Sequence, residues 1–503
     1  MAKFLGIDAG TTSLKAALFD LEGHLLAIDR QEYQLLTPSP SMVELNAETY
    51  WQACCRAVRN VIRQSDTDSE EIAALCISSQ GETLIPVDEE GAPLRNAIVW
   101  LDNRAVEEAA SINGQFGAET IYHVTGQPEV APTWPACKVL WIKRNEPEVF
   151  ARTAKFLLVE DYLLHRLTGQ FVTEYCIQTS SLLVDIQNKA WWEPMFDFIG
   201  MSPDRLGQLM EPGEVVGPLS KLGAEAVGLS TWTVAVSGAM DQMMGAVGAG
   251  NIAPGVVTET TGGALAIIVT LDKPLFDPQR HVPCYYHARR DGYCLMPWGQ
   301  TAGMALKWFR DQFYHLEAQV ALASGLDPYD LMTRAAGHVP AGSEGLVVLP
   351  HLEGASCPEF NPAARAVFYG ATLRHTKAHF ARAIMESVAY MLKKNLDLVE
   401  QLGVTVEEVR SMGGGARSDL WLQIKADVLQ KPIATVEVEE TACLGAALTA
   451  AVATGFFASL EAGVSRMVRL RETVEPTQDQ REVYRQGYGR YLELYDRLAP
   501  MFV

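Results

Sequence analysis

A strand–turn–strand pattern that occurs twice constrains the fold of this chain more than any other feature. The first copy has apolar runs at 4–8 and 14–20 around an AGTT turn, and a run at 25–32 adds a third strand. The second copy has runs on both sides of a Thr-Gly-Gly turn at 261–263. Such runs favour β-strands, and Thr and Gly between them favour tight turns. The pattern predicts two related halves whose turns face each other across a cleft, with chance similarity as the alternative.

The rest of the chain alternates between helical and strand-like patterns. Because 503 residues exceed what one hydrophobic core usually supports, we expect more than one domain. Tyrosines at helical spacing near the C-terminus predict a packing face rather than a ligand site. We therefore expect an α/β fold with an N-terminal domain at 1–248 and a C-terminal domain at 249–503. The predicted helices lie at about 47–65, 104–114, 302–316, 376–402, 417–430 and 441–454, with buried strands near 77 and 98.

Composition argues against two classes of partner. With 41 basic and 61 acidic side chains, the net charge of -20 repels nucleic acid and anionic membrane surfaces. The nine cysteines contain no CxxC pair, and no leader-like segment precedes the first strand, so the expected compartment is the reducing cytoplasm. The uncharged stretch at 442–460 is rich in Ala, Gly and Thr, and therefore predicts a buried helix rather than a membrane span.

Asp8 ends the first predicted strand and is followed by a turn that contains Thr11 and Thr12. Amides and hydroxyls in such a turn can point at one anion, and Lys15 on the next strand adds a positive charge. A carboxylate beside a phosphate site needs a hard cation between them, so Asp8 is a candidate Mg²⁺ ligand. From these residues alone, a hairpin turn closed by Asp and Thr is an equal alternative.

Two further segments supply candidate nucleotide contacts. Thr261 and Gly262 in the second turn offer a second set of phosphate donors. The stretch at 412–419 contains Gly414, Gly415 and Ser418 before a predicted helix, so its backbone can approach an anion or a polar ring closely. A flexible loop capped by Ser418 is the alternative. The chain contains neither GxxxxGK[ST] nor GxGxxG at a strand–helix junction, so the predicted site is of another type.

Several segments, in the correct order, resemble the FGGY carbohydrate kinases, which include xylulokinases, glycerol kinases, gluconokinases and ribulokinases. The resemblance covers nearly the whole chain, and the second signature departs only mildly, at Ala371. The matching segments are the first phosphate hairpin (6–15), the first signature (135–141), the catalytic segment (237–242), the second signature (370–386) and the adenosine loop (413–419).

This resemblance implies a two-lobed ribonuclease-H-like fold of the actin, hexokinase and Hsp70 type, with ATP in the interdomain cleft. It implies that Asp241 is the catalytic base, that Gln242 beside it contacts substrate and that Gly303 belongs to the ATP site. The implied cofactors are ATP and Mg²⁺, with the metal at Asp8. The implied partner is a small sugar or polyol, and a homodimer is an assembly common in the family.

Two motifs bear on the substrate. Gln80, Gly81 and Glu82 lie in a segment intermediate between the xylulokinase and glycerol kinase patterns, because it lacks both the His of the former and the Arg of the latter. Trp100 and Asp102 resemble part of the WxDxR motif of xylulokinases and gluconokinases, and Asp102 could accept hydrogen bonds from two vicinal hydroxyls. We predict a ketopentose such as D-xylulose. The alternatives are a polyol of the erythritol or glycerol type and an aldonate such as gluconate.

A function of another class also stays open. A non-metabolic actin-like ATPase, such as a chaperone or a filament subunit, would use the same phosphate hairpins and would act on a partner protein. The segment around Asp241 and the polar clusters at 80–82 and 100–102 favour the kinase. An inactive family member that acts as a sensor is a further alternative.

Overall fold

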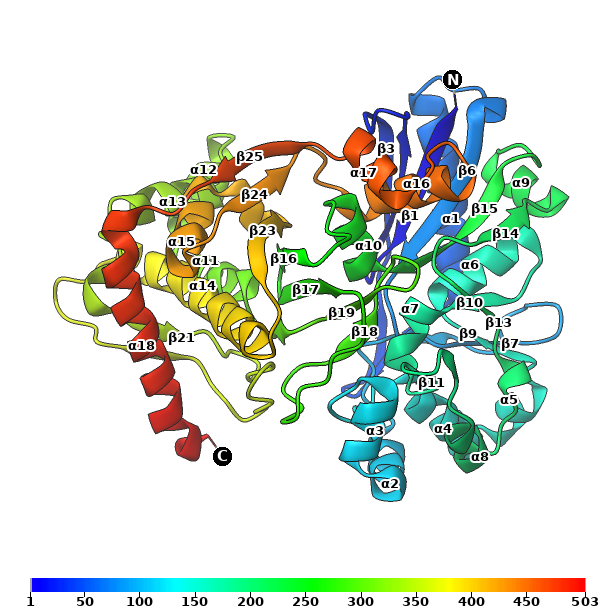
Figure 1. The fold of residues 1–503 in the computed structure, drawn as a ribbon, viewed down its shortest axis with the longest axis horizontal. Coiled ribbons are helices and arrows are strands. Elements are labelled where there is room, and N and C mark those ends of the chain that lie inside the picture. Colours follow the sequence, from blue (N-terminus) through cyan, green and yellow to red (C-terminus); the bar gives the residue numbers. More distant parts are fainter. Residues whose placement is uncertain (1, 503) are drawn as a thin grey trace. The chain divides into compact units, whose positions relative to one another are not determined.

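The computed structural model describes residues 2–502 and divides them into two compact units. The first unit contains the segments up to Ile252, Thr270–Cys294 and Glu440–Arg469. The second contains Ala253–Val269, Leu295–Glu439 and the segment from Leu470 onward. Each unit is therefore assembled from non-consecutive stretches of chain around a sheet of its own (Figure 1).

The first unit is built on a six-stranded mixed sheet with the strand order β14-β15-β6-β1-β2-β3. Strands β1, β2 and β3 form an antiparallel meander, whereas β1, β6 and β15 run parallel to one another. The three strands predicted around the first turn are thus confirmed. The strands are β1 (Lys3–Ala9), β2 (Ser13–Phe19), β3 (Leu25–Glu32), β6 (Ile72–Ser79), β14 (Val215–Pro218) and β15 (Val234–Met240).

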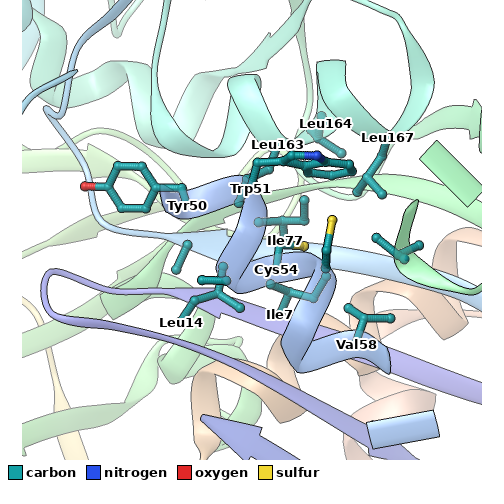
Figure 2. Packing of buried hydrophobic residues seen from close by; sticks show 14 of the residues in the cluster. Ile7, Leu14, Tyr50, Trp51, Cys54, Val58, Ile77, Leu163, Leu164 and Leu167 are labelled. Carbon is teal, nitrogen blue, oxygen red and sulfur yellow. The ribbon is translucent and has the colours of Figure 1, made fainter. Parts of the chain in front are cut away.

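Helices cover both faces of this sheet, which explains why β1 and β2 are buried at nearly every position. Helix α1 (Ala47–Gln64) packs across β2 and β3, and α6 (Val159–Thr168) packs against β6 and β15. Figure 2 shows Tyr50, Trp51 and Val58 of α1 among apolar side chains of β1, β2, β6 and α6. These side chains form the core that supports the ends of the central strands.

On the other face, α16 (Thr441–Ala453) packs against β1 and α10 (Asp241–Gly248) at very short range. A Cβ at Gly6 would lie 1.9 Å from the Cys443 carbonyl oxygen, and one at Gly445 would lie 2.1 Å from that of Met244. Only glycine allows this approach. The predicted buried helix at 441–454 is thus confirmed, and among residues 2–502 no helix is long and apolar enough to cross a membrane.

Short strands and helices complete the first unit around this central layer. Strands β4, β5 and β8 form a three-stranded sheet, and β7-β9, β10-β13 and β11-β12 form pairs. These elements are β4 (Leu36–Ser39), β5 (Met42–Leu45), β7 (Ile85–Val87), β8 (Ala97–Ile98), α2 (Val106–Phe116), α3 (Ala118–Thr125), α4 (Pro135–Asn145), α5 (Pro147–Arg152), β9 (Lys155–Leu157), β10 (Val172–Glu174), α7 (Tyr175–Gln178), β11 (Val184–Asp185), β12 (Ala190–Trp191), α8 (Glu193–Ile199), β13 (Gln208–Met210), α9 (Lys221–Val227), β18 (Cys284–Tyr286), β19 (Tyr293–Leu295) and α17 (Leu460–Met467).

The sheet of the second unit repeats the directions of the first. Its strands follow the order β17-β16-β23-β24-β25, with β20 paired to β17. In each sheet an antiparallel hairpin is followed by two parallel neighbours and then by an antiparallel strand. This shared order supports the predicted repeat of one pattern in two halves. The strands are β16 (Gly255–Thr261), β17 (Leu265–Leu271), β20 (Trp298–Gly299), β23 (Val406–Met412), β24 (Ile433–Val436) and β25 (Leu470–Val474).

Long helices pack beside this second sheet, as the sequence predicts. Among the C-terminal tyrosines, Tyr484, Tyr491 and Tyr495 are buried, which confirms the packing face. The predicted helix at 302–316 is divided in two at Tyr314. The remaining elements are α11 (Gly303–Phe313), α12 (His315–Ala323), α13 (Pro328–Gly337), β21 (Val347–Leu349), β22 (Val367–Tyr369), α14 (Lys377–Gln401), α15 (Asp419–Leu429) and α18 (Arg481–Leu498).

Candidate functional site

Three parallel strands of the first unit end at the same edge of the sheet. In the strand register, Asp8 of β1 lies beside Ser78 of β6, and Met240 of β15 lies beside Ser79. Asp241 follows Met240 directly, and Gln80 follows Ser79. The sheet thus gathers residues that are more than 200 positions apart in the sequence, because the carboxyl ends of parallel strands meet at one edge. Asp8, Gln80 and Asp241 were all candidate site residues.

The buried carboxylate of Asp8 has little hydrogen-bond stabilisation. Its best donor is the Ser78 hydroxyl, whose oxygen lies 3.5 Å from Asp8 Oδ1. Burial raises the pKa of Asp8 to about 6, and the charge of Glu440 raises it further while that of Lys15 lowers it. Lys15 lies opposite Asp8 in the β1–β2 ladder and forms an ion pair with Glu440. Glu440 was not among the predicted residues, since it is 425 positions from Lys15.

Asp241 is the first residue of α10, directly after β15. Its Oδ1 accepts a hydrogen bond from the Gln242 backbone N–H at 2.7 Å. Burial, followed by the charge of Asp8, raises the pKa of Asp241 to about 7. A carboxyl group whose pKa lies near neutral pH is suited to proton transfer.

Trp100 connects the predicted phosphate hairpin to the predicted substrate loop. Its indole Nε1–H donates to the Thr11 hydroxyl at 2.8 Å, and its backbone N–H donates to the Thr83 hydroxyl at 3.0 Å. Thr12, the next hairpin residue, is exposed. The structure therefore brings Thr11 and Trp100 together, although the sequence placed them in different motifs.

Gln80 and Glu82 lie on either side of a tightly packed Gly81. A Cβ at Gly81 would lie 2.8 Å from the Met240 methyl carbon, so the loop lies directly against the strand that carries Asp241. The Gln80 amide nitrogen donates to the Tyr50 hydroxyl at 2.8 Å, whereas its buried Oε1 has no hydrogen-bond partner among residues 2–502. Glu82 has a positive φ of 56°. Burial raises the pKa of its carboxyl group.

Lys138 in α4 is fully buried and hydrogen-bonds to the backbone of this loop. Its Nζ donates to the carbonyl oxygens of Glu82 at 2.9 Å and Val99 at 3.0 Å. Burial lowers the pKa of Lys138 to about 7. The sequence placed Lys138 in the first signature but gave it no role, because nothing in the local pattern identifies its partners.

Asp102 has a different environment from the one predicted. Its carboxylate is fully buried and accepts from the Val43 N–H at 2.6 Å and from the Arg104 side chain at 2.7 and 2.8 Å. Arg104 also pairs with Glu44. Since protein donors occupy both oxygens of Asp102, the geometry favours a role in holding this loop rather than the predicted contact with vicinal hydroxyls.

The second unit contains a cavity of about 610 Å³. It lies between the β16–β17 turn, α11, α13 and the start of α15, and both apolar and polar side chains line it. All six residues of this unit that were predicted to bind ATP line the cavity: Thr261, Gly262, Gly303, Gly414, Gly415 and Ser418. Sequence reasoning missed α13, which contributes Tyr329, Asp330, Thr333 and Arg334.

Glycines allow the segments around this cavity to approach each other. The Gly303 N–H donates to the Gly262 carbonyl oxygen at 2.9 Å, which joins the start of α11 to the hairpin turn. A Cβ at Gly415 would lie 2.6 Å from the Thr261 Cβ. Ser418 caps α15, with its hydroxyl accepting from the Trp421 N–H at 3.3 Å. Ser418 thus caps the helix, as the alternative interpretation of this loop predicts, and it also lines the cavity.

A buried ion pair lies beneath the second hairpin turn. Lys425 and Glu259 are fully buried, with 2.5 Å between Nζ and Oε1. Lys425 Nζ also donates to the Thr261 hydroxyl at 3.0 Å, and that hydroxyl donates to Glu259 Oε2 at 2.7 Å. The Thr261 hydroxyl was predicted to face phosphate, but it takes part in this internal network instead.

Comparison with known proteins decides the family. The model of the N-terminal domain of the FGGY family of carbohydrate kinases matches residues 3–248, and that of the C-terminal domain matches residues 260–454. The chain belongs to the FGGY family of carbohydrate kinases. As an FGGY member it is a carbohydrate kinase, a phosphotransferase with the two-domain fold of this family.

Relatives of this FGGY kinase carry different substrate names. It is 32% identical to a gluconokinase of Bacillus subtilis over 96% of this chain and 93% of the relative. It is 30% identical to a xylulose kinase of the same organism over 98% of this chain and 97% of the relative. The structure of xylulose kinase from Rhodospirillum rubrum has a TM-score of 0.91 and 28% identity, with 99% of each chain covered. These similarities do not choose between the two sugars, and they give no support to the actin-like ATPase alternative.

Proposed function

We propose that this FGGY kinase transfers the terminal phosphate of ATP to a hydroxyl of a neutral ketopentose such as D-xylulose, with Asp241 as the base. The observation that carries the proposal is the position of Asp241 at the same edge of the sheet as Asp8, where burial and the charge of Asp8 raise the pKa of Asp241 to about 7. We assign sugar binding to the N-terminal lobe at 1–248 and the nucleotide to the C-terminal lobe at 249–503, consistent with the ranges of the two family models.

The cavity of the second unit is the proposed nucleotide site. Its volume of about 610 Å³ suits a nucleotide, and Gly414 and Gly415 offer backbone to a ligand without side-chain obstruction. Thr11 and Thr12 in the first hairpin are the further phosphate contacts that we propose. Lys15 lies near these residues but forms an ion pair with Glu440, so its positive charge is largely balanced within the chain.

Asp8 is the proposed site of Mg²⁺. The fit is chemical, because a buried carboxylate with a single distant hydroxyl donor gains from a cation beside it. Among residues 2–502 no cluster of three or more His, Cys, Asp or Glu side chains could hold a metal. Asp8 would therefore be the main protein ligand, which agrees with the preference of Mg²⁺ for water and phosphate oxygens. When bound, the metal supplies charge neutralisation at the phosphate oxygens.

Asp241 would orient the attacking hydroxyl and accept its proton. Phosphoryl transfer passes through a loose transition state, so positioning contributes more than early deprotonation. A pKa of about 7 lets Asp241 be ionised at neutral pH and still hold a proton well enough to receive one late in the reaction. Gln80, Gly81, Glu82, Trp100 and Gln242 are the residues that we propose for binding the sugar.

The charges near these residues favour a neutral sugar over an aldonate. Asp8, Glu82 and Asp241 are all acidic, and a substrate carboxylate would need a cation to offset them. The nearby basic groups are already engaged, since Lys15 pairs with Glu440, Arg104 pairs with Asp102, and Lys138 donates to two carbonyl oxygens. A ketopentose or a polyol meets this environment without an added charge.

A substrate panel tests this choice. The purified protein would be incubated with MgATP and, separately, with D-xylulose, D-ribulose, erythritol, glycerol and D-gluconate, and ADP release and the phosphorylated product would be measured. We expect the highest kcat/KM with a ketopentose. A gluconate kcat/KM above that of every neutral compound would refute the electrostatic argument, while leaving the assignment as a carbohydrate kinase intact.

A further inference from the structure

Three carboxyl groups lie fully buried behind the strand that carries Asp241. They belong to Glu160 and Asp161 at the start of α6 and to Glu174 at the end of β10. Within residues 2–502 none of the three forms an ion pair. Glu160 Oε2 and Asp161 Oδ1 also have no hydrogen-bond partner among these residues. A buried carboxyl group without a cation needs another explanation.

In the part of the chain that the structure describes, Glu160 has a single hydrogen-bond partner, which lies in an irregular part of β15. The pairing of β15 with β6 shifts register between Val236 and Ala239. Gly238 lies within this irregularity and donates its backbone N–H to Glu160 Oε1 at 2.7 Å. A Cβ at Gly238 would lie 1.7 Å from the Ile77 carbonyl oxygen, so the strand passes too close to β6 for any larger residue. Glu160 therefore satisfies an amide at the irregularity.

This hydrogen bond lies three residues before Asp241. β15 ends at Met240 and α10 begins at Asp241, so the path of the strand from Gly238 onward sets where the Asp241 side chain points. The short helix α7, which follows Glu174, also packs against β15. Glu160 and α7 thus hold the last residues of the strand from the side of the buried carboxyl cluster.

The hydrogen bonds indicate which carboxyl group carries a proton. Glu174 accepts from two backbone amides, those of Cys176 and Ile177, whereas Glu160 accepts from one and leaves its second oxygen without a donor. Neighbouring buried carboxylates cannot all be ionised. Burial raises the pKa of Glu160 well above its usual range, and the charge of Asp161 raises it further. Because Glu160 has fewer donors than Glu174, it holds a proton more readily than Glu174 does.

We propose that Glu160, as a neutral carboxylic acid, is a positioning residue for Asp241: its carbonyl-type oxygen accepts from Gly238 and fixes the strand end that presents the base. This inference rests on the proposed role of Asp241. What Glu160 must supply is an acceptor of the right shape without a charge, and glutamine meets the same requirement. The titratable groups whose pKa values its charge affects are Glu174, Cys76 and Cys176.

The test compares Glu160→Gln, Glu160→Met and Asp161→Asn with wild type and Asp241→Asn. Glu160→Gln keeps the acceptor for Gly238, and Glu160→Met removes it at similar volume. Asp161→Asn is the matched control, because Asp161 accepts from Leu158 at the start of its own helix and makes no hydrogen bond to β15. The readouts are kcat, KM for sugar and for MgATP, the pH profile of kcat, and the thermal unfolding midpoint.

We expect Glu160→Gln to keep kcat within about threefold of wild type, with the same pH profile. Glu160→Met should lower kcat by roughly 10- to 100-fold with both KM values within about twofold, because a misdirected base slows transfer without loosening binding. Asp161→Asn should keep the wild-type kcat.

Several results would overturn the proposal. They are a wild-type kcat in Glu160→Met, a Glu160→Gln as impaired as Glu160→Met, and a selective fall of kcat in Asp161→Asn. Should Glu160→Met not fold, Glu160→Gln decides alone, since a required negative charge at Glu160 would shift its pH profile or lower its unfolding midpoint. Full activity in Asp241→Asn would instead refute the base assignment, so the two failures are distinguishable.

Discussion

Asp8 and Asp241 lie at the ends of β1 and β15, the two parallel neighbours of β6, and the charge of Asp8 helps burial to raise the pKa of Asp241 to about 7. Both carboxyl groups therefore have pKa values raised toward neutral pH, to about 6 for Asp8 and about 7 for Asp241. Asp8 is suited to bind a metal ion and Asp241 is suited to accept a proton. The proposed reaction needs both roles.

The activity should depend on pH in the direction set by Asp241. As pH rises through about 7, this carboxyl group loses its proton and becomes able to act as a base. With MgATP saturating, we expect kcat/KM for the sugar to rise about tenfold per unit below neutral pH and to level off above it. Rates measured from roughly pH 5.5 to 8.5 check this. A flat profile across that range would contradict the proposed base.

Asp241→Asn should stabilise the fold at alkaline pH while it removes activity. A carboxyl group whose folded pKa is raised contributes stability that is fully present below its unfolded pKa of 3.8 and is lost as pH rises through about 7. At pH above this value the variant no longer carries a buried charge. We expect a gain of about 1–2 kcal/mol in the free energy of unfolding, less than the full shift implies because Asp241 keeps some solvent contact.

Urea unfolding without Mg²⁺ or ATP, at acid and at alkaline pH, measures this difference. The gain should disappear at acid pH, where the wild-type Asp241 is also neutral. A variant less stable than wild type at alkaline pH would mean that the folded protein stabilises the negative charge, which is the opposite of a raised pKa.

Lys138→Met should weaken sugar binding more than it slows transfer. Without the amine, the carbonyl oxygens of Glu82 and Val99 lose their donor, at a cost of about 1–3 kcal/mol. We expect the KM for sugar to rise about tenfold with little change in the KM for MgATP. Lys143→Met is the matched control in the same helix, since Lys143 donates to Ile199 and not to the substrate loop. An unchanged KM for sugar in Lys138→Met would contradict this role.

Lys425→Met should destabilise the second unit strongly. It leaves Glu259 buried without its cation, which typically costs about 3–5 kcal/mol. The double variant Lys425→Met with Glu259→Gln removes both charges, so it should be more stable than the single variant. Chemical unfolding of both proteins measures the order of stability. The reverse order would show that the pair is not coupled as the hydrogen bonds indicate.

Adjacent glycines in the second unit should respond differently to alanine. At Gly415 a new Cβ would lie 2.6 Å from the Thr261 Cβ, whereas at Gly414 it would meet no atom within 4 Å. We expect Gly415→Ala to lower the free energy of unfolding by about 1–3 kcal/mol, and Gly414→Ala to leave it nearly unchanged. Gly415→Ala should also weaken ATP binding, measured by calorimetry, because it displaces the hairpin turn. Equal stability of the two variants would contradict the tight packing at Gly415.

Local patterns predicted the parts of the molecule that depend on local physics. The hairpins around 9–12 and 261–263 follow from apolar runs and turn residues, and the buried helix at 441–454 follows from its composition. Of the six predicted residues that line the cavity, five follow from the Thr-Gly-Gly turn and the glycine-rich loop before α15, whereas Gly303 came from the family resemblance.

Contacts between residues far apart in the sequence could not be predicted, because no local pattern indicates them. The ion pair between Lys15 and Glu440 joins residues 425 positions apart, and the bond from Gly238 to Glu160 spans 78. Asp102 illustrates the same limit, since the sequence shows a carboxylate but not the donors that surround it. Such contacts depend on the register of the sheet and on the packing of helices against it.

The most direct test of the central claim is sugar-dependent ADP release by wild type and by Asp241→Asn, with ATP binding measured in parallel. We expect wild type to release ADP with D-xylulose, and Asp241→Asn to lose about 10²- to 10⁴-fold of that rate while it still binds ATP. ATP hydrolysis at one rate with and without every sugar, or undiminished transfer in Asp241→Asn, would contradict the claim.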